Sequence, residues 1–217
     1  MIFAMLDPLR ETMHIVSYSL LAPTIIILLL LVAFIVFELG SLLVEIFTER
    51  RKGKPNIPEL LESFQGKDVQ EITAEIDNSN LFRRQKLALH ELLNHSDLPA
   101  VSMQALARRL LTDEELHYFK ITNRTDVVAR LGPMLGLMAT LIPLGPGLIA
   151  LGQGDTKTLA DCLLTAFDAT VTGLAAAAIA FAISRLRKRW YEDYLSSLEA
   201  LMESLLEVFA GEPRVTE

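Results

Sequence analysis

Long runs of apolar residues, without the alternation typical of a half-buried strand, occupy three stretches of the chain. They cover residues 15–37, 131–151 and 162–184. A helix needs about 20 apolar residues to cross a hydrocarbon core about 30 Å thick, and each stretch is that long. The first run is too long for the apolar part of a cleaved signal peptide, and no small-residue cleavage site follows it. The pattern therefore predicts an integral membrane protein with three transmembrane helices.

Basic residues gather at one end of every predicted span, whereas the opposite side has only Arg10 and Lys157. Lysine and arginine are retained on the cytoplasmic side of a membrane. The bias predicts a multi-pass protein of the plasma (cytoplasmic) membrane. Its N-terminus and the 152–161 loop would lie outside, and its C-terminus in the cytoplasm. The basic residues that carry this prediction are Arg50, Arg51, Lys52, Lys54, Lys120, Arg124, Arg130, Arg185, Arg187, Lys188 and Arg189.

The cytoplasmic insert, residues 45–130, has a helical pattern. Leucines between residues 81 and 93 recur at helical spacing, and Pro99 suits the first turn of a further helix. Residues 112–115 (Thr-Asp-Glu-Glu) have the sequence of a capping box, in which the threonine would begin another helix. An apolar stripe over residues 191–209 continues the third span without a breaker. We therefore predict that the third transmembrane helix extends far into the cytoplasm.

The predicted fold class is an all-α integral membrane protein with three transmembrane helices, a helical cytoplasmic insert and an extended third helix. The predicted segments are an outer N-terminal segment (1–14), the first transmembrane helix (15–44), the cytoplasmic helical insert (45–130), the second transmembrane helix (131–151), an outer loop (152–161), the third transmembrane helix (162–184), and a cytoplasmic helical extension with the tail (185–217).

Composition narrows the function by exclusion. The net charge of -7 argues against a nucleic-acid partner. The single cysteine, Cys162, excludes an internal disulfide bond. His90 and Glu91 begin like a zinc-protease helix, but Asn94 stands where the second histidine would be needed. We therefore expect no catalytic residues, no metal site and no cofactor, in a protein that is not an enzyme.

The second and third spans carry polar, small and helix-bending residues that a membrane anchor does not need. With 3.6 residues per turn, each span gathers a small and polar face. Such faces are typical of close helix packing or of a path for something polar. On the second span this face consists of Pro133, Gly136, Thr140, Pro143 and Gly147. On the third span it consists of Ala166, Thr170, Gly173 and Ala177.

Asp168 is the one carboxylate inside the third predicted span. It lies two residues from Thr170, about 200° around the helix, and shares a second polar face with Thr165 and Thr172. For these two threonines we favour hydrogen bonds to their own preceding carbonyls. A carboxylate at this depth costs at least ~2.5 kcal/mol on insertion scales, so it calls for a specific role. The sequence leaves open whether it is protonated, paired or facing water.

Two motifs point to a family. Residues 133–140 are Pro-Met-Leu-Gly-Leu-Met-Ala-Thr, and residues 166–174 are Ala-Phe-Asp-Ala-Thr-Val-Thr-Gly-Leu. They resemble the P-x-L-G-L-x-x-T second span and the A-x-x-A-T-x-x-G-L third span of the MotA/TolQ/ExbB proton channel family, in its ExbB/TolQ-like form. Three spans, an outer N-terminus, a large cytoplasmic insert and an inward extension of the third span also match the plan of that family.

The resemblance implies a ring-forming stator subunit of an ion-driven rotary motor, with the proton as the expected ion. It implies a homopentamer in the membrane lipid around two copies of a single-span partner like ExbD, TolR or MotB. The conducting carboxylate would belong to the partner's helix. Thr140 and Thr170 would line the pore beside it, and the small faces would leave room for the partner helices to rotate.

The chain departs from the family pattern at three positions. Thr165 stands where the ExbB pattern has a glutamate, Asp168 where it has an apolar residue, and Pro143 where the relatives usually have glycine. The choice between proton and sodium, and the process that is energised, therefore stay open. As an alternative from another class, the chain would be a non-conducting membrane scaffold that recruits a cytoplasmic partner through residues 45–130.

Overall fold

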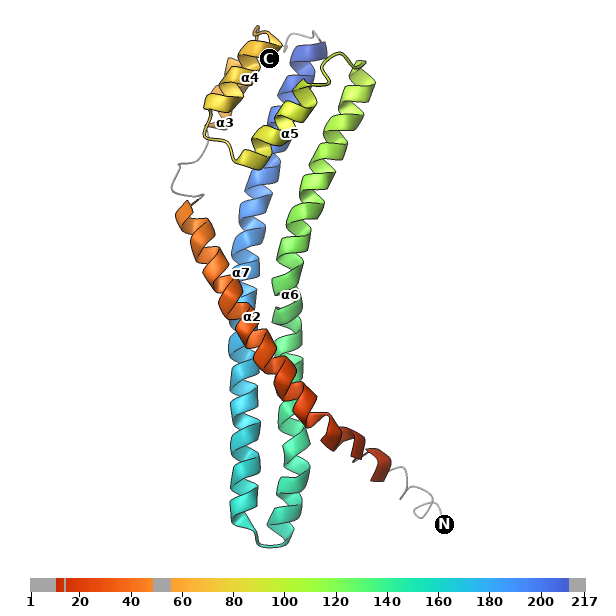
Figure 1. The fold of residues 1–217 in the computed structure, drawn as a ribbon, viewed down its shortest axis with the longest axis vertical. Coiled ribbons are helices and arrows are strands. Elements are labelled where there is room, and N and C mark those ends of the chain that lie inside the picture. Colours follow the sequence, from red (N-terminus) through yellow and green to blue (C-terminus); the bar gives the residue numbers. More distant parts are fainter. Residues whose placement is uncertain (1–10, 14, 49–55, 211–217) are drawn as a thin grey trace, which may run out of the picture. The chain divides into compact units, whose positions relative to one another are not determined.

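The computed structural model describes residues 11–13, 15–48 and 56–210, and every regular element in this part of the chain is helical (Figure 1). Three helices are long and apolar enough to cross a membrane, which confirms the predicted fold class. Most of the predicted outer N-terminal segment and the end of the predicted C-terminal tail lie outside the described residues. The elements are α2 (Leu21–Thr48), α3 (Ile57–Ser63), α4 (Val69–Asn78), α5 (Arg83–Leu93), α6 (Ala100–Gly152) and α7 (Thr156–Ala210).

The chain divides into two compact units. We call residues 1–42 and 123–185 the transmembrane unit, and residues 43–122 and 186–217 the insert unit. Helices α2, α6 and α7 contribute residues to both units, whereas α3, α4 and α5 belong to the insert unit alone.

Helix α6 is 53 residues long and contains the predicted second span as its C-terminal part. The predicted capping box at Thr112 is wrong, because Thr112 lies inside α6 and its hydroxyl donates a hydrogen bond to the carbonyl of Arg108 (2.9 Å). The neighbouring Leu110 and Leu111 pack against the core of the insert unit. Continuing the helix keeps both leucines partly buried against this core and adds backbone hydrogen bonds. These gains outweigh the local capping signal.

Helix α7 is 55 residues long, about 80 Å at 1.5 Å per residue. It confirms that the third span continues as one helix without a break. Only residues 153–155 separate α6 from α7, so most of the predicted 152–161 loop is helical. Gly154 makes this turn with a φ of 77°, which glycine adopts without steric cost. The side chain of Asp155 then accepts hydrogen bonds from the hydroxyl (2.5 Å) and the N–H (3.1 Å) of Thr158, and they lower the pKa of Asp155.

The insert unit has a core of large apolar side chains. Leu198, Leu201 and Leu205, on the predicted stripe of the α7 extension, are fully buried in it. This part of α7 is therefore packed within the insert unit, and α3 to α6 supply its neighbours. The buried members of the core are Phe64, Ile72, Ile76, Leu81, Ala88, Leu89, Leu92, Leu93, Met103, Ala107, Tyr194, Leu198, Leu201, Met202 and Leu205.

A polar and aromatic network joins α5, α6 and α7 in the insert unit. Arg84 donates two hydrogen bonds to the carboxylate of Glu114 (2.8 and 2.9 Å), which also accepts one from the hydroxyl of Tyr194 (3.3 Å). The ring of Tyr118 stacks on that of Tyr191, with centroids 4.2 Å apart. Burial raises the pKa of both Tyr191 and Tyr194, so they stay neutral and able to donate.

Candidate functional site

The two longest helices of the transmembrane unit meet at a pair of glycines. A Cβ atom at Gly132 would lie 2.8 Å from the carbonyl oxygen of Gly173. A Cβ atom at Gly173 would lie 2.7 Å from the carbonyl oxygen of Gly132 and 3.0 Å from the Cα of Gly136. The backbones of α6 and α7 are therefore in direct contact, and no larger residue fits at this crossing without moving a helix.

Most of the predicted small face lies in this contact. Gly136, Pro143 and Gly147 on α6 are buried, and Pro133 is half-buried. On α7, Ala166, Gly173 and Ala177 are buried. Packing between two helices of one chain therefore explains why the glycines and Ala177 are small, without any partner helix. Their lining of a pore stays a prediction.

Thr140 and Thr170 lie at the edge of the same contact, and both are half-buried. A Cβ atom at Gly136, one turn before Thr140, would be 3.5 Å from the Cα of Thr170. The two threonines therefore lie about one helical turn apart along the hairpin that α6 and α7 form. The hydroxyl of Thr140 donates to the carbonyl of Leu137 (2.6 Å), and that of Thr170 donates to the carbonyl of Ala166 (3.1 Å). Each hydroxyl proton is donated to a carbonyl of the same helix. The lone pairs of each hydroxyl oxygen therefore stay available for a passing donor or cation.

Helix α2 covers the other side of the hairpin, and Figure 1 shows it lying across α6 and α7. Its Leu28 packs against Ala139, Ala169 and Leu135, and its Ile35 packs in a second cluster further from the α6–α7 turn. A helix turns by about 100° per residue, so Thr170 lies about 100° beyond Ala169 and Thr140 about 140° beyond Leu135. Both threonines are therefore turned away from the side that α2 covers.

Asp168 lies on the exposed face of α7, away from the contact with α6. Within the described part of the chain, its carboxylate has no hydrogen-bond or ion-pair partner. The hydroxyl of Thr165 donates to the carbonyl of Asp161 (2.9 Å), as we predicted. The same prediction for Thr172 is wrong, because among the described residues its hydroxyl makes no such hydrogen bond. The structure thus separates Asp168 from the pair Thr140 and Thr170, in agreement with the spacing in the sequence.

A polar contact that the sequence does not predict links α6 and α7 at the end of the transmembrane unit far from the α6–α7 turn. The hydroxyl of Ser184, which is 2% exposed, donates a short hydrogen bond to the carboxylate of Asp126 on α6. Thr125, the preceding residue, is completely buried. Both partners lie at or beyond the ends of the predicted spans, among basic residues, where a carboxylate gives no signal of a buried contact.

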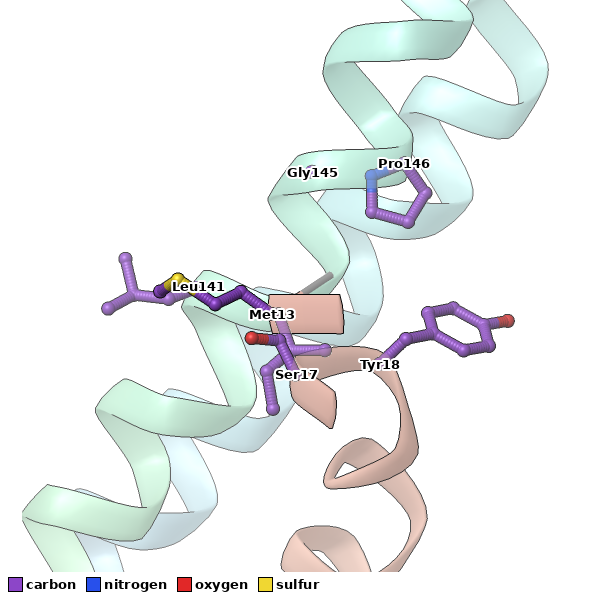
Figure 2. A pocket seen from close by; sticks show the side chains of 7 residues that line it. Met13, Ser17, Tyr18, Leu141, Gly145 and Pro146 are labelled. Carbon is purple, nitrogen blue, oxygen red and sulfur yellow. The ribbon is translucent and has the colours of Figure 1, made fainter. Parts of the chain in front are cut away.

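Two shallow pockets lie against the exposed side of α6. Figure 2 shows the first, about 270 Å³ in volume, with Met13, Ser17 and Tyr18 on one wall and Leu141, Ile142, Gly145 and Pro146 on the other. The second shares part of this lining. Neither contains a predicted site residue, and apolar side chains dominate both, so they hold no chemistry for catalysis or ion binding.

The histidines of the insert unit have separate partners. His90 Nε2 lies 2.8 Å from a carboxylate oxygen of Asp77, and His95 Nδ1 lies 2.9 Å from the carbonyl oxygen of Glu91. In residues 11–13, 15–48 and 56–210, no group of three or more His, Cys, Asp or Glu side chains is arranged to hold a metal ion.

Comparison with known proteins agrees with the motifs of the hairpin. The family model described as the MotA/TolQ/ExbB proton channel family matches residues 75–200, which is more than half of the chain and includes all of the candidate site. No curated protein gives a significant match to the sequence. The structure has three helices that are able to span a membrane, and the family match covers the hairpin and the adjoining part of the insert. The chain is therefore a membrane protein that belongs to the MotA/TolQ/ExbB proton channel family.

Proposed function

We propose that this chain is the ring-forming subunit of an ion-driven rotary membrane motor, with the proton as the expected ion. In this proposal five copies surround two copies of a single-span partner of the ExbD, TolR or MotB kind. The observation that carries the proposal is the position of Thr140 and Thr170. They lie about one helical turn apart along the two helices, half-buried, on the side of the hairpin that α2 leaves uncovered.

A pore wall in a membrane needs polar atoms that accept a hydrogen bond from a passing group, or contact a passing ion, without binding it permanently. The two threonine oxygens meet this need, since each proton is already donated to the helix backbone. Beside Thr170 on α7, the exposed apolar side chain of Leu174 offers an apolar surface to a rotating helix. The conducting carboxylate beside the threonines would come from the partner.

The glycine contact supports the second part of the proposal, that the hairpin acts as a fixed wall. Helices α6 and α7 touch through their backbones at Gly132 and Gly173, so they cannot slide past one another without a clash. A rigid wall is what a rotating partner needs in order to transmit torque outside the membrane. The proposed orientation, with the α6–α7 turn outside, follows from the distribution of basic residues.

Ion-driven flux through the assembled complex tests the proposal. The full chain would be produced with the single-span protein encoded beside it, and proton or sodium uptake measured in liposomes. Removing one hydroxyl oxygen, worth about 1 kcal/mol, should lower flux about fivefold in Thr170→Ala and in Thr140→Val, with assembly intact. Thr112→Val is the matched control, because Thr112 makes the same kind of backbone hydrogen bond in the insert unit.

The alternative, a non-conducting scaffold, gives the opposite result. A scaffold would tolerate both pore variants and would lose its partner when the surface of the insert unit is changed. Full flux in both single variants, Thr170→Ala and Thr140→Val, would therefore contradict the proposed pore lining.

A further inference from the structure

A line of oxygen-bearing side chains follows α7 from its start into the apolar part of the transmembrane unit. Asp161, Thr165, Asp168 and Thr172 are separated by four, three and four residues, which places them on one face of the helix. The first three are exposed and Thr172 is half-buried. Eleven residues at 1.5 Å each make this line about 16 Å long, roughly half of a hydrocarbon core.

No fixed positive charge is available to Asp168 at its depth. Among the described residues its carboxylate has no partner. The predicted spans 15–37, 131–151 and 162–184 contain no lysine or arginine, so a second copy of the chain would bring none to this level either. The nearest cation along the chain is Lys157, eleven residues and about 16 Å towards the outer end. What neutralises Asp168 must therefore come from outside the spans.

We infer that Asp168, together with the hydroxyls of Thr165 and Thr172, binds the monovalent cation that the motor uses, a proton or an alkali ion. Carboxylate and hydroxyl oxygens are the donors that hard cations prefer. Thr165 donates its own proton to the carbonyl of Asp161, so its oxygen is free to face a cation (2.9 Å). Ionisable side chains inside a membrane typically face a bundle interior or a water-filled cavity, and they mark ion paths.

This site is distinct from the pore face of the proposed function. Asp168 and Thr170 are about 200° apart on α7, so a cation at Asp168 is on the far side of the helix from Thr170. In the proposed ring, we place this far side of α7 against the neighbouring copy. The inference rests on the proposed function for its transported ion, but cation binding at Asp168 can be measured without any partner or flux.

Cation-dependent labelling tests the binding step. The full chain in lipid nanodiscs would be treated with a lipid-soluble carbodiimide, which adds to protonated carboxyl groups in apolar surroundings, and the peptides analysed by mass spectrometry. We expect modification at Asp168 and little at Asp161 near the aqueous boundary. Protection by sodium chloride, but not by choline chloride, at constant pH identifies an alkali site. Protection by rising pH alone identifies a proton site. Equal modification of Asp161 and Asp168 under every condition overturns the inference.

Thr165→Val and Thr172→Val test whether the hydroxyls belong to the site. Each should weaken the protection of Asp168 severalfold if its oxygen contacts the cation, and unchanged protection in the double variant would remove both from it. In the flux assay, Asp168→Asn should lower uptake by about tenfold or more, as expected for losing a charged hydrogen-bonding group, and Asp168→Glu should keep most of it. Asp161→Asn is the matched control on the same helix.

The two proposals fail in different ways. If Thr170→Ala lowers flux and Asp168→Asn does not, the result supports the proposed motor and contradicts the cation site at Asp168. If labelling of Asp168 responds to cations but the wild-type complex conducts no ions, the result supports the cation site and contradicts the proposed motor.

Discussion

The two units of this chain pack their helices in opposite ways. In the transmembrane unit, α6 and α7 meet through glycine and alanine, so that the Cβ of a larger residue at Gly173 would collide with backbone. In the insert unit, leucines and tyrosines hold the same two helices, and a paired arginine and glutamate joins α5 to α6. Residues 100–122 and 186–210 thus form a water-soluble type of core, and the rest of the same helices forms a membrane type.

The surroundings explain the difference. In water, burying large apolar side chains is strongly favourable, and a helix gains most from leucine and phenylalanine. In lipid that gain is absent, and helices associate through close van der Waals contact, which small residues permit. Residue size at the contact therefore marks where each helix passes from one solvent to the other. Variants that change the size or polarity of a residue at either kind of contact test this difference.

The largest effect is expected from a cavity in the insert unit. Leu201 is 0% exposed, and Leu201→Ala should cost about 2–5 kcal/mol of the free energy of unfolding. Hydrogen exchange measured peptide by peptide would locate the loss, with faster exchange in α3 to α5 and little change between residues 131 and 170. Leu87→Ala, at a position 59% exposed on α5, is the control and should change stability by less than about 0.5 kcal/mol. Equal loss in both variants would contradict a core centred on Leu201.

Overfilling the glycine contact should have the next largest effect. The backbone atoms 2.7 and 3.0 Å from a Cβ at Gly173 cannot move aside as a flexible side chain would. Gly173→Ala should therefore cost about 1–3 kcal/mol, measured as a lower melting temperature in detergent. Gly145→Ala is the matched control on α6, since nothing lies within 4 Å of its Cβ, and it should be neutral or stabilising by up to about 1 kcal/mol. A harmless Gly173→Ala would rule out backbone contact between the helices.

The sequence predicts the helices of this fold better than their contacts. The unbroken α7 follows from a stripe that continues the third span, and the apolar runs identify the candidate spans. The capping signal at Thr112 misleads because it is local, whereas the burial of Leu110 and Leu111 depends on residues far along the chain. A helix pattern shows which residues share a face and does not show what that face meets.

The sequence likewise predicts which residues of the candidate site share a helix face, and not what that face contacts. The spacing of Thr170 and Asp168 correctly places them on different sides of α7. The small residues were correctly grouped, but their contact is with the other helix of the same hairpin, as Gly132 and Gly173 show. The sequence could not separate this contact from a pore, because both require small residues. Ser184 and Asp126 gave no signal, since their pairing joins positions 58 residues apart in the chain.

The smallest effect is expected from this last contact, and it completes the comparison of the two units. A hydrogen bond between transmembrane helices contributes on average only about 0.6 kcal/mol, because the separated helices find other partners in the membrane. Ser184→Ala should therefore lower stability by about 0.6–1.7 kcal/mol in detergent, less than Gly173→Ala. Ser197→Ala is the matched control, because Ser197 donates only to the carbonyl of Asp193 within α7. A larger loss in Ser184→Ala than in Gly173→Ala would mean that a polar contact, rather than the small residues, holds the hairpin together.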